Sequence, residues 1–155
     1  MKLEPNVWFD EVVKTYHLIS PHIHHTQLVT CPDLNEELDG RFLFKPESLQ
    51  ITGSFKVRGA LSAISRLSKD ELKRGVIAYS SGNHAQGVAH AAKVFNTPAT
   101  VVMPKDAPER KIANAKALGA EVIYYDRRTE SREEISREIA KEKNLVIINP
   151  YDALE

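Results

Sequence analysis

The sequence lacks the features that mark secreted and membrane-spanning proteins. Its only cysteine, Cys31, has no partner for an internal disulfide bond, and residues 1–5 carry no apolar signal-peptide core. No apolar run approaches the roughly 20 residues that cross a bilayer. We therefore expect a cytoplasmic protein in a reducing compartment, with no membrane as its partner.

An excess of charge of either sign is also absent. The 21 basic residues balance 21 acidic residues, so electrostatics does not favour nucleic acid as a partner. Small neutral or zwitterionic ligands fit this balance better. With 42% hydrophobic and 27% charged residues among 155, the chain has a globular composition and the length of one domain, or of one domain and part of another.

Recognisable metal-ligand sets are missing as well. His22, His24 and His25 invite a metal hypothesis, but no fourth ligand accompanies them at a familiar spacing. The alternation of residues 22–24 favours an extended strand instead. We expect no metal site here.

The second half of the chain has a regular alternation of strands and helices. Four apolar, β-rich runs start 23, 22 and 24 residues apart, which leaves room for a strand and a crossover helix in each interval. The predicted fold class is therefore α/β, with an open four-stranded parallel sheet, and ligands of such sheets bind beyond the carboxyl ends of the strands. The predicted strands are residues 76–79, 99–103, 121–125 and 145–148, and the predicted helices are residues 85–95, 108–118 and 130–143.

Shorter signals outline the rest of the chain. Residues 8–18 form the pattern of an amphipathic helix that Pro21 ends, and residues 41–45 that of a strand. Residues 68–71 match a capping box at the start of a helix that Gly75 stops.

The turn after the first strand of the sheet is rich in polar groups. Ser80 and Ser81 supply hydroxyls, Gly82 lets the backbone approach a ligand, and Asn83 and His84 add an amide and an imidazole. Free backbone N–H groups at the start of the following helix make a ready anion site. The alternative is an ordinary turn that Asn83 caps. The turn is neither a dinucleotide fingerprint nor a P-loop, which disfavours a mononucleotide-binding domain.

A second polar turn, residues 51–55, leads directly into an apolar helix with Lys56 in its first turn. Positions 57, 60, 61, 64 and 67 recur at helical spacing and give this helix an inward face. A cation at the positive end of the helix dipole is unfavourable as a purely structural charge. Lys56 is therefore a candidate nucleophile, working as a neutral amine or through a Schiff base with a carbonyl cofactor. A lysine on a solvated surface is the alternative.

Both turns together resemble one enzyme family. Residues 52–60 (Thr-Gly-Ser-Phe-Lys-Val-Arg-Gly-Ala) and 80–87 (Ser-Ser-Gly-Asn-His-Ala-Gln-Gly) are similar to the fold-type II pyridoxal-phosphate enzymes, in the branch of the threonine dehydratases and serine racemases. Residues 45–50 and 116–122 are similar to that family too, so the resemblance covers nearly the whole chain. Gln27 stands where the family usually has proline, in a loop away from the chemistry.

The resemblance implies a role for each matching residue. Lys56 would hold pyridoxal 5'-phosphate as an imine and then move the α-proton of the substrate. Phe55 would lie against the pyridine ring, and Asn83 would hydrogen-bond the 3-hydroxyl group. Ser81 would face the cofactor from the side opposite Lys56, as a second acid or base. The groups implied to bind the substrate carboxylate are the backbone donors of Ser80, Ser81, Gly82, Asn83 and His84 and the side chain of Arg132.

The resemblance also implies a reaction. We expect a pyridoxal-phosphate-dependent threonine/serine dehydratase, an ammonia-lyase that abstracts the α-proton and eliminates the β-hydroxyl to give a 2-oxo acid and ammonia. Serine racemase is the alternative, because both reactions begin with the same carbanion. A non-catalytic amino-acid-binding or assembly module is the alternative from another class.

Parts of the family pattern have no counterpart in the sequence. The tetraglycine loop that grips the phosphate and a serine near the family's C-terminus are both missing before Glu155. The expected organisation is an incomplete large-domain segment at 1–68, a small parallel α/β domain at 69–151, and the start of a connection back at 152–155. We expect this polypeptide alone to bind the cofactor weakly, and the full-length protein to be a homo-oligomer that acts on a small amino acid.

Overall fold

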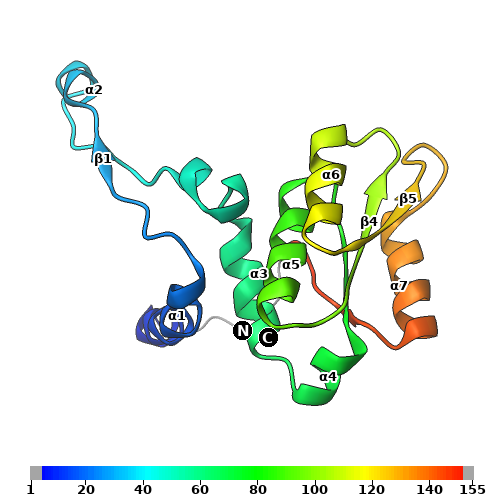
Figure 1. Ribbon diagram of the computed structural model, residues 1–155. Helices are drawn as coiled ribbons and strands as arrows, with labels where there is room; N and C mark the ends of the chain where they lie inside the picture. The colour runs from blue at the N-terminus through cyan, green and yellow to red at the C-terminus, as the bar shows by residue number, and fades with distance from the viewer. Residues whose placement is uncertain (1–4, 152–155) are drawn as a thin grey trace.

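A parallel sheet with helices on both faces is the centre of the fold (Figure 1). The computed structural model describes residues 5–151. The sheet has four strands in the order β5-β4-β3-β6, and Val76 lies opposite both Ala99 and Val146. This confirms the predicted open four-stranded parallel sheet. Its strands are β3 (Val76–Tyr79), β4 (Ala99–Pro104), β5 (Glu121–Tyr125) and β6 (Val146–Ile147).

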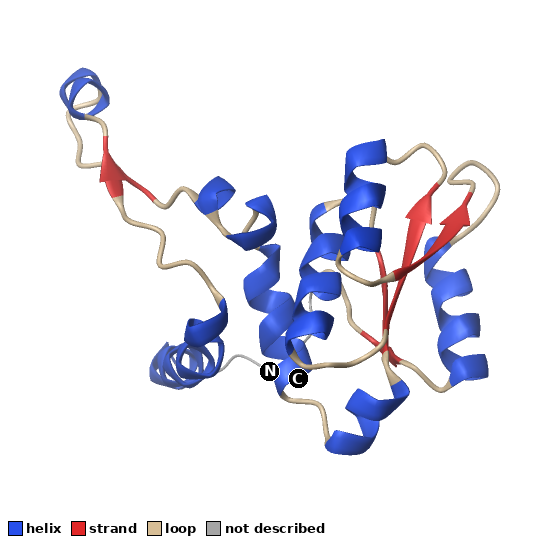
Figure 2. Cartoon of the chain, viewed as in Figure 1, coloured by secondary structure: helices blue, strands red, loops and turns tan. Residues whose placement is uncertain are grey.

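Helices cover both faces of the sheet (Figure 2), and alternate side chains of the strands pack against helices on opposite faces. Val101 and Met103 pack with alanines of α5 (Asn83–Val94) and α6 (Glu109–Ala117). Their neighbour Val102 packs with Ala140 of α7 (Arg132–Lys143) on the other face. The connection from β3 to β4 thus crosses one face of the sheet. The connection from β5 to β6 crosses the opposite face and places β6 on the other side of β3. This makes the gap between β3 and β6 the topological switch point of the sheet.

Helix α3 (Lys56–Ser65) packs on α5 and places Lys56 at the carboxyl edge of the sheet. Its expected inward face is confirmed, since Val57, Ala60, Leu61 and Ile64 are buried. The α3 and α5 backbones approach closely, because a Cβ added at Gly87 would lie 3.1 Å from the carbonyl oxygen of Lys56.

The N-terminal segment extends away from the sheet (Figure 1). It begins with the predicted amphipathic helix, which starts before residue 8 and ends at Ile19. Its elements are α1 (Pro5–Ile19), the 3-10 turn η1 (Ser20–His22), β1 (Val29–Thr30), α2 (Pro32–Glu37), β2 (Leu43–Phe44), and the 3-10 turns η2 (Glu47–Leu49) and η3 (Ile51–Gly53).

The expected strand over residues 22–24 is wrong, and the strand expected over 41–45 is shorter than its pattern. His22 ends the 3-10 turn η1. The side chain of Gln50 accepts a hydrogen bond from the backbone N–H of His24 at 2.8 Å and donates one to its carbonyl at 2.8 Å. These contacts occupy the backbone groups that a neighbouring strand would need. The strand near 41–45 is β2, which pairs antiparallel with β1.

Helix α4 (Lys69–Arg74) connects α3 to the sheet and has the capping box that the sequence predicts. The Ser68 side chain accepts from the backbone N–H of Glu71, and the Glu71 side chain accepts from the backbone N–H of Ser68. Gly75 ends the helix at φ 101°, a conformation that glycine adopts without strain. Within residues 5–151, no helix is long and apolar enough to cross a membrane.

Candidate functional site

A cavity of about 390 Å³ lies at the switch point between β3 and β6. It brings together residues that are far apart in the sequence, from the first turns of three helices and from the loops after two strands. None of the residues that line it is an aspartate or a glutamate. The lining residues are Lys56, Tyr79, Ser80, Ser81, Gly82, Asn83, His84, Arg132, Pro150 and Tyr151.

Lys56 presents its amine to this cavity from the first turn of α3. Its Nζ donates a hydrogen bond to the carbonyl oxygen of Pro150 at 2.5 Å. Within residues 5–151, no carboxylate forms an ion pair with this amine. Phe55 is 58% exposed and is not part of the cavity wall, although its ring centroid lies 5.4 Å from the same Nζ. The structure thus holds the Lys56 amine in a cavity wall with a neutral partner.

The polar turn of residues 80–84 offers fewer free backbone donors than its five residues suggest. The N–H of Ser80 donates to the carbonyl of Val102 at 3.0 Å, and the N–H of Gly82 donates to the Ser80 hydroxyl at 3.1 Å. In the described part of the chain, the N–H groups of Ser81, Asn83 and His84 have no such partner. These three donors, at the positive end of the α5 dipole, are the ones available to an anion.

Asn83 does not cap α5, so the capping role that the alternative gave to Asn83 is wrong. The cap position is Gly82, and Asn83 is the first residue of the helix. Only the oxygen of its side chain is occupied, because Oδ1 accepts a hydrogen bond from Lys111 Nζ at 2.6 Å. Lys111 is a contact that the sequence did not predict. The two residues lie 28 positions apart, on helices whose packing against each other no local pattern specified.

His84 is a buried, neutral member of the site. Only 5% of the residue is exposed, and Nε2 lies 3.0 Å from the carbonyl oxygen of Ile148. Because a carbonyl only accepts, Nε2 carries the proton. Burial lowers the pKa of His84 below its usual value of 6.5, with a smaller contribution from the charge of Lys56. The imidazole therefore adds no charge at neutral pH and ties the start of α5 to the end of β6.

Arg132 supplies the second cation of the cavity from the first turn of α7. Its guanidinium lies 5.4 Å from the centroid of the Tyr79 ring, and Nη2 lies 3.4 Å from the hydroxyl of Tyr151. Nε donates to Glu133 at 2.8 Å.

Burial raises the pKa of Tyr79, so its hydroxyl stays protonated and neutral. Tyr79 was not predicted as a site residue, although it is the last residue of a predicted strand and the rule on strand ends could have found it.

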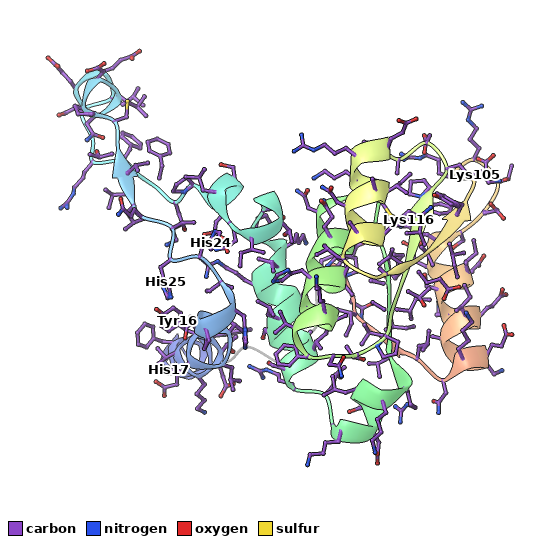
Figure 3. All side chains as sticks on the ribbon, viewed as in Figure 1. Tyr16, His17, His24, His25, Lys105 and Lys116 are labelled. Atoms are coloured by element: carbon purple, nitrogen blue, oxygen red, sulfur yellow. The ribbon has the colours of Figure 1, made fainter. Side chains whose placement is uncertain are left out.

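The histidines of the N-terminal segment take no part in this site. His24 and His25 lie on the segment that leads away from α1 (Figure 3). Nδ1 of His25 lies 3.2 Å from the Tyr16 hydroxyl. Across residues 5–151, no group of three histidine, cysteine or acidic side chains is placed to hold a metal ion.

Comparison with known proteins agrees with this geometry. Residues 19–154 match the family described as "Pyridoxal-phosphate dependent enzyme". The chain belongs to this family. The resemblance to the fold-type II enzymes is thereby confirmed, and pyridoxal phosphate is the cofactor of the family.

Named relatives carry out several reactions. The chain is 44% identical over 144 residues to the L-threo-3-hydroxyaspartate ammonia-lyase of Saccharomyces cerevisiae, covering 93% of the chain and 44% of that enzyme. It is 40% identical over 146 residues to the L-threonine ammonia-lyase of Thermotoga maritima, covering 94% of the chain and 36% of the relative. The crystal structure of serine racemase from Dictyostelium discoideum superposes with a TM-score of 0.87 at 36% identity, covering 94% of the chain and 47% of that protein. The chain thus spans less than half of the length of these relatives.

The cavity fits pyridoxal phosphate on its own chemistry. Imine formation requires an amine that is not paired with a carboxylate. Lys56 provides such an amine. Two cations, free backbone donors and no acidic lining suit a ligand with negatively charged oxygens. The residues that would hold the cofactor are Lys56, through its amine, and Asn83, through its amide.

Proposed function

We propose that the protein is a pyridoxal-phosphate-dependent ammonia-lyase that converts threonine or serine into a 2-oxo acid and ammonia. The observation that carries the proposal is the convergence of Lys56 and the turn of residues 80–84 on one cavity at the switch point of the sheet. Family membership supports pyridoxal-phosphate chemistry, and the relatives' names support ammonia-lyases and racemases as the reaction classes.

The cavity residues divide the work of this reaction. Bound pyridoxal phosphate supplies an electron sink that stabilises negative charge at the substrate Cα. Lys56 Nζ accepts the proton from Cα. The free N–H groups of Ser81, Asn83 and His84 bind the substrate carboxylate, and Arg132 adds a charge-assisted contact. The β-hydroxyl takes up a proton, such as the one held by Lys56, and leaves as water; a water molecule then hydrolyses the remaining enamine to the 2-oxo acid and ammonia.

Serine racemisation is the second candidate, because it begins with the same loss of the α-proton. Ser81 lines the same cavity as Lys56, and its hydroxyl would be a second group that can return a proton to Cα, although Ser81 alone does not decide between the two reactions. A non-catalytic amino-acid-binding or assembly module is the alternative from another class. It would use the same N–H groups without any bond to Lys56.

Product analysis of the full-length protein tests these functions. We expect 2-oxobutanoate and ammonia from L-threonine, and pyruvate from L-serine. Accumulation of D-serine would instead select the racemase. Borohydride reduction with pyridoxal phosphate should label Lys56, and Lys56→Ala should lower kcat by at least about a hundredfold. Absence of any product together with an unlabelled Lys56 would reject the enzyme and leave the binding module.

We also propose a division of the chain to go with this function. Residues 69–151 would form the small α/β domain and residues 1–68 a segment of a larger one, while residues 152–155 lie outside the described part. The larger unit would complete the phosphate site, which is why we expect weak cofactor binding by this polypeptide alone. That the full-length protein is a homo-oligomer and lies in the cytoplasm stays a prediction.

A further inference from the structure

We infer that Lys111 is a positioning residue that fixes the amide of Asn83, so that the cavity meets the amide as a hydrogen-bond donor. The inference rests on the proposed function, because its ligand is the pyridoxal phosphate held by that cavity. Lys111 lies on α6 and does not line the cavity, whereas Asn83 does. Its Nζ reaches the Asn83 side chain at 2.6 Å.

This contact determines which way the amide faces. A lysine ammonium has three donors and no acceptor, so the amide atom beside it must be the oxygen. The amide is planar, and its nitrogen points away from the bond that its oxygen makes. In the described part of the chain, Asn83 makes no other side-chain hydrogen bond. Both hydrogens of Nδ2 are therefore left for a ligand in the cavity.

The position of Lys111 is itself well determined. One turn along each helix, Asn114 of α6 donates to Gln86 of α5 at 2.9 Å, which repeats the contact between Lys111 and Asn83. The stem of Lys111 also covers the polar turn, since a Cβ added at Gly82 would lie 3.9 Å from its Cδ and Cε. These contacts between α5 and α6 thus hold the Lys111 ammonium beside Asn83 in the cavity wall.

The consequence for the ligand is chemical. A cofactor oxygen that contacts Asn83 meets a donor, and a donor favours the ionised form of that oxygen. If the amide turned over, its oxygen would face the ligand and disfavour that form. Lys111 prevents this rotation of the amide, because the rotation would place the donor Nδ2 against the Lys111 ammonium, which is also a donor. Its removal therefore changes the protonation of the ligand through Asn83.

Lys111→Met in the full-length protein tests the inference, with pyridoxal phosphate as the probe. We expect the Kd of pyridoxal phosphate for this variant to be about tenfold higher than for the wild type, as for loss of a charge-assisted hydrogen bond. We also expect the pH midpoint of the absorbance of bound cofactor to move upward. Lys111→Arg keeps a cationic donor and should restore part of both values. The matched control is Lys116→Met, which removes the same charge from the same helix (Figure 3). The Lys116 ammonium lies 5.6 Å from the centroid of the Tyr124 ring.

A double-mutant cycle separates action through Asn83 from a general effect of charge. In an Asn83→Ala background, Lys111→Met should change neither the Kd nor the pH midpoint. The inference is overturned if Lys111→Met matches the wild type, or if its effect persists undiminished without Asn83. Thermal unfolding without cofactor identifies any variant that fails to fold. Failure of the wild type to bind the cofactor at all would refute the proposed function itself, which is a different outcome.

Discussion

At the scale of single residues, one ion pair connects the lysine helix to the segment that precedes it. Arg58, two residues after Lys56, donates to both carboxylate oxygens of Glu47, at 2.7 and 2.8 Å. Thr26 donates a third hydrogen bond to Glu47 at 2.7 Å. Arg58 is the main reason that the pKa of Glu47 falls from 4.5 to about 2, and Thr26 contributes further. Bidentate geometry and partial burial make this pair stronger than an ordinary surface pair.

We predict that Glu47→Gln lowers the free energy of unfolding by about 2 kcal/mol at pH 7. The pKa of the folded state is depressed, so this stabilisation is present above pH 4.5 and is lost as the pH falls toward about 2. Urea unfolding of both proteins between pH 2 and pH 7 should show their difference shrinking over this interval. A difference that stays constant with pH would mean that the charge of Glu47 is not its cause.

The control for this prediction is Asp106→Asn. Asp106 pairs with Arg127 at 2.9 Å, but both side chains are at least half exposed. Exposed pairs contribute at most about 1 kcal/mol, so the control should unfold nearly as the wild type does.

Residue types and their positions in the sequence predicted Lys56 and the turn of residues 80–84 as members of the site, and the family resemblance added Arg132. All of them line the cavity. Lys111 was missed because its contact crosses between elements, whereas Tyr79, at the end of a predicted strand, was within reach of the rule on strand ends. The hydrogen bond from Lys111 to Asn83, for example, joins residues 28 positions apart. No local pattern specifies which side chain of a neighbouring helix will face a given turn.

At the scale of secondary-structure elements, the packing of α3 on α5 determines where Lys56 lies. Gly87 of α5 allows the contact, because its missing Cβ would lie 3.1 Å from the Lys56 carbonyl and 3.2 Å from the backbone nitrogen of Val57. Backbone atoms within a packed helix cannot move aside as a flexible side chain can.

We predict that Gly87→Ala destabilises the protein by about 1 to 3 kcal/mol through overpacking, despite the higher helix propensity of alanine. The matched variant is Gly59→Ala on the outer face of α3, where an added Cβ meets nothing within 4 Å. That variant should gain about 0.5 to 1 kcal/mol from propensity alone. Thermal unfolding measures both changes, and equal shifts in the two variants would refute the close contact.

At the scale of the whole molecule, the sheet and the N-terminal arm differ in how much they bury. Strands β3 and β4 form part of the buried cores of the fold. The arm formed by β1, α2 and β2 leaves large apolar side chains in the open, with Val29 46%, Leu43 53% and Phe44 44% exposed. Regions with few buried apolar contacts open more readily than cores do.

We predict that the backbone amides of β3 and β4 exchange with deuterium at least about a hundredfold more slowly than those of β1 and β2. Exchange followed by mass spectrometry on this chain measures both regions in one experiment. Equal protection would contradict the prediction and would mean that another surface covers the arm.

The sequence alone determined the class of the fold, the four strands and three crossover helices of its sheet, and the two polar turns that meet at the cavity. Apolar periodicity and turn composition are local properties, and short-range physics is enough to read them. The order of the strands is different, because a hydrogen bond such as that from Ile148 to Ile77 joins residues far apart in the chain. Only the tertiary structure decided that β6 lies beside β3. Pairing of these strands brings Pro150 to the amine of Lys56 and closes the cavity between them.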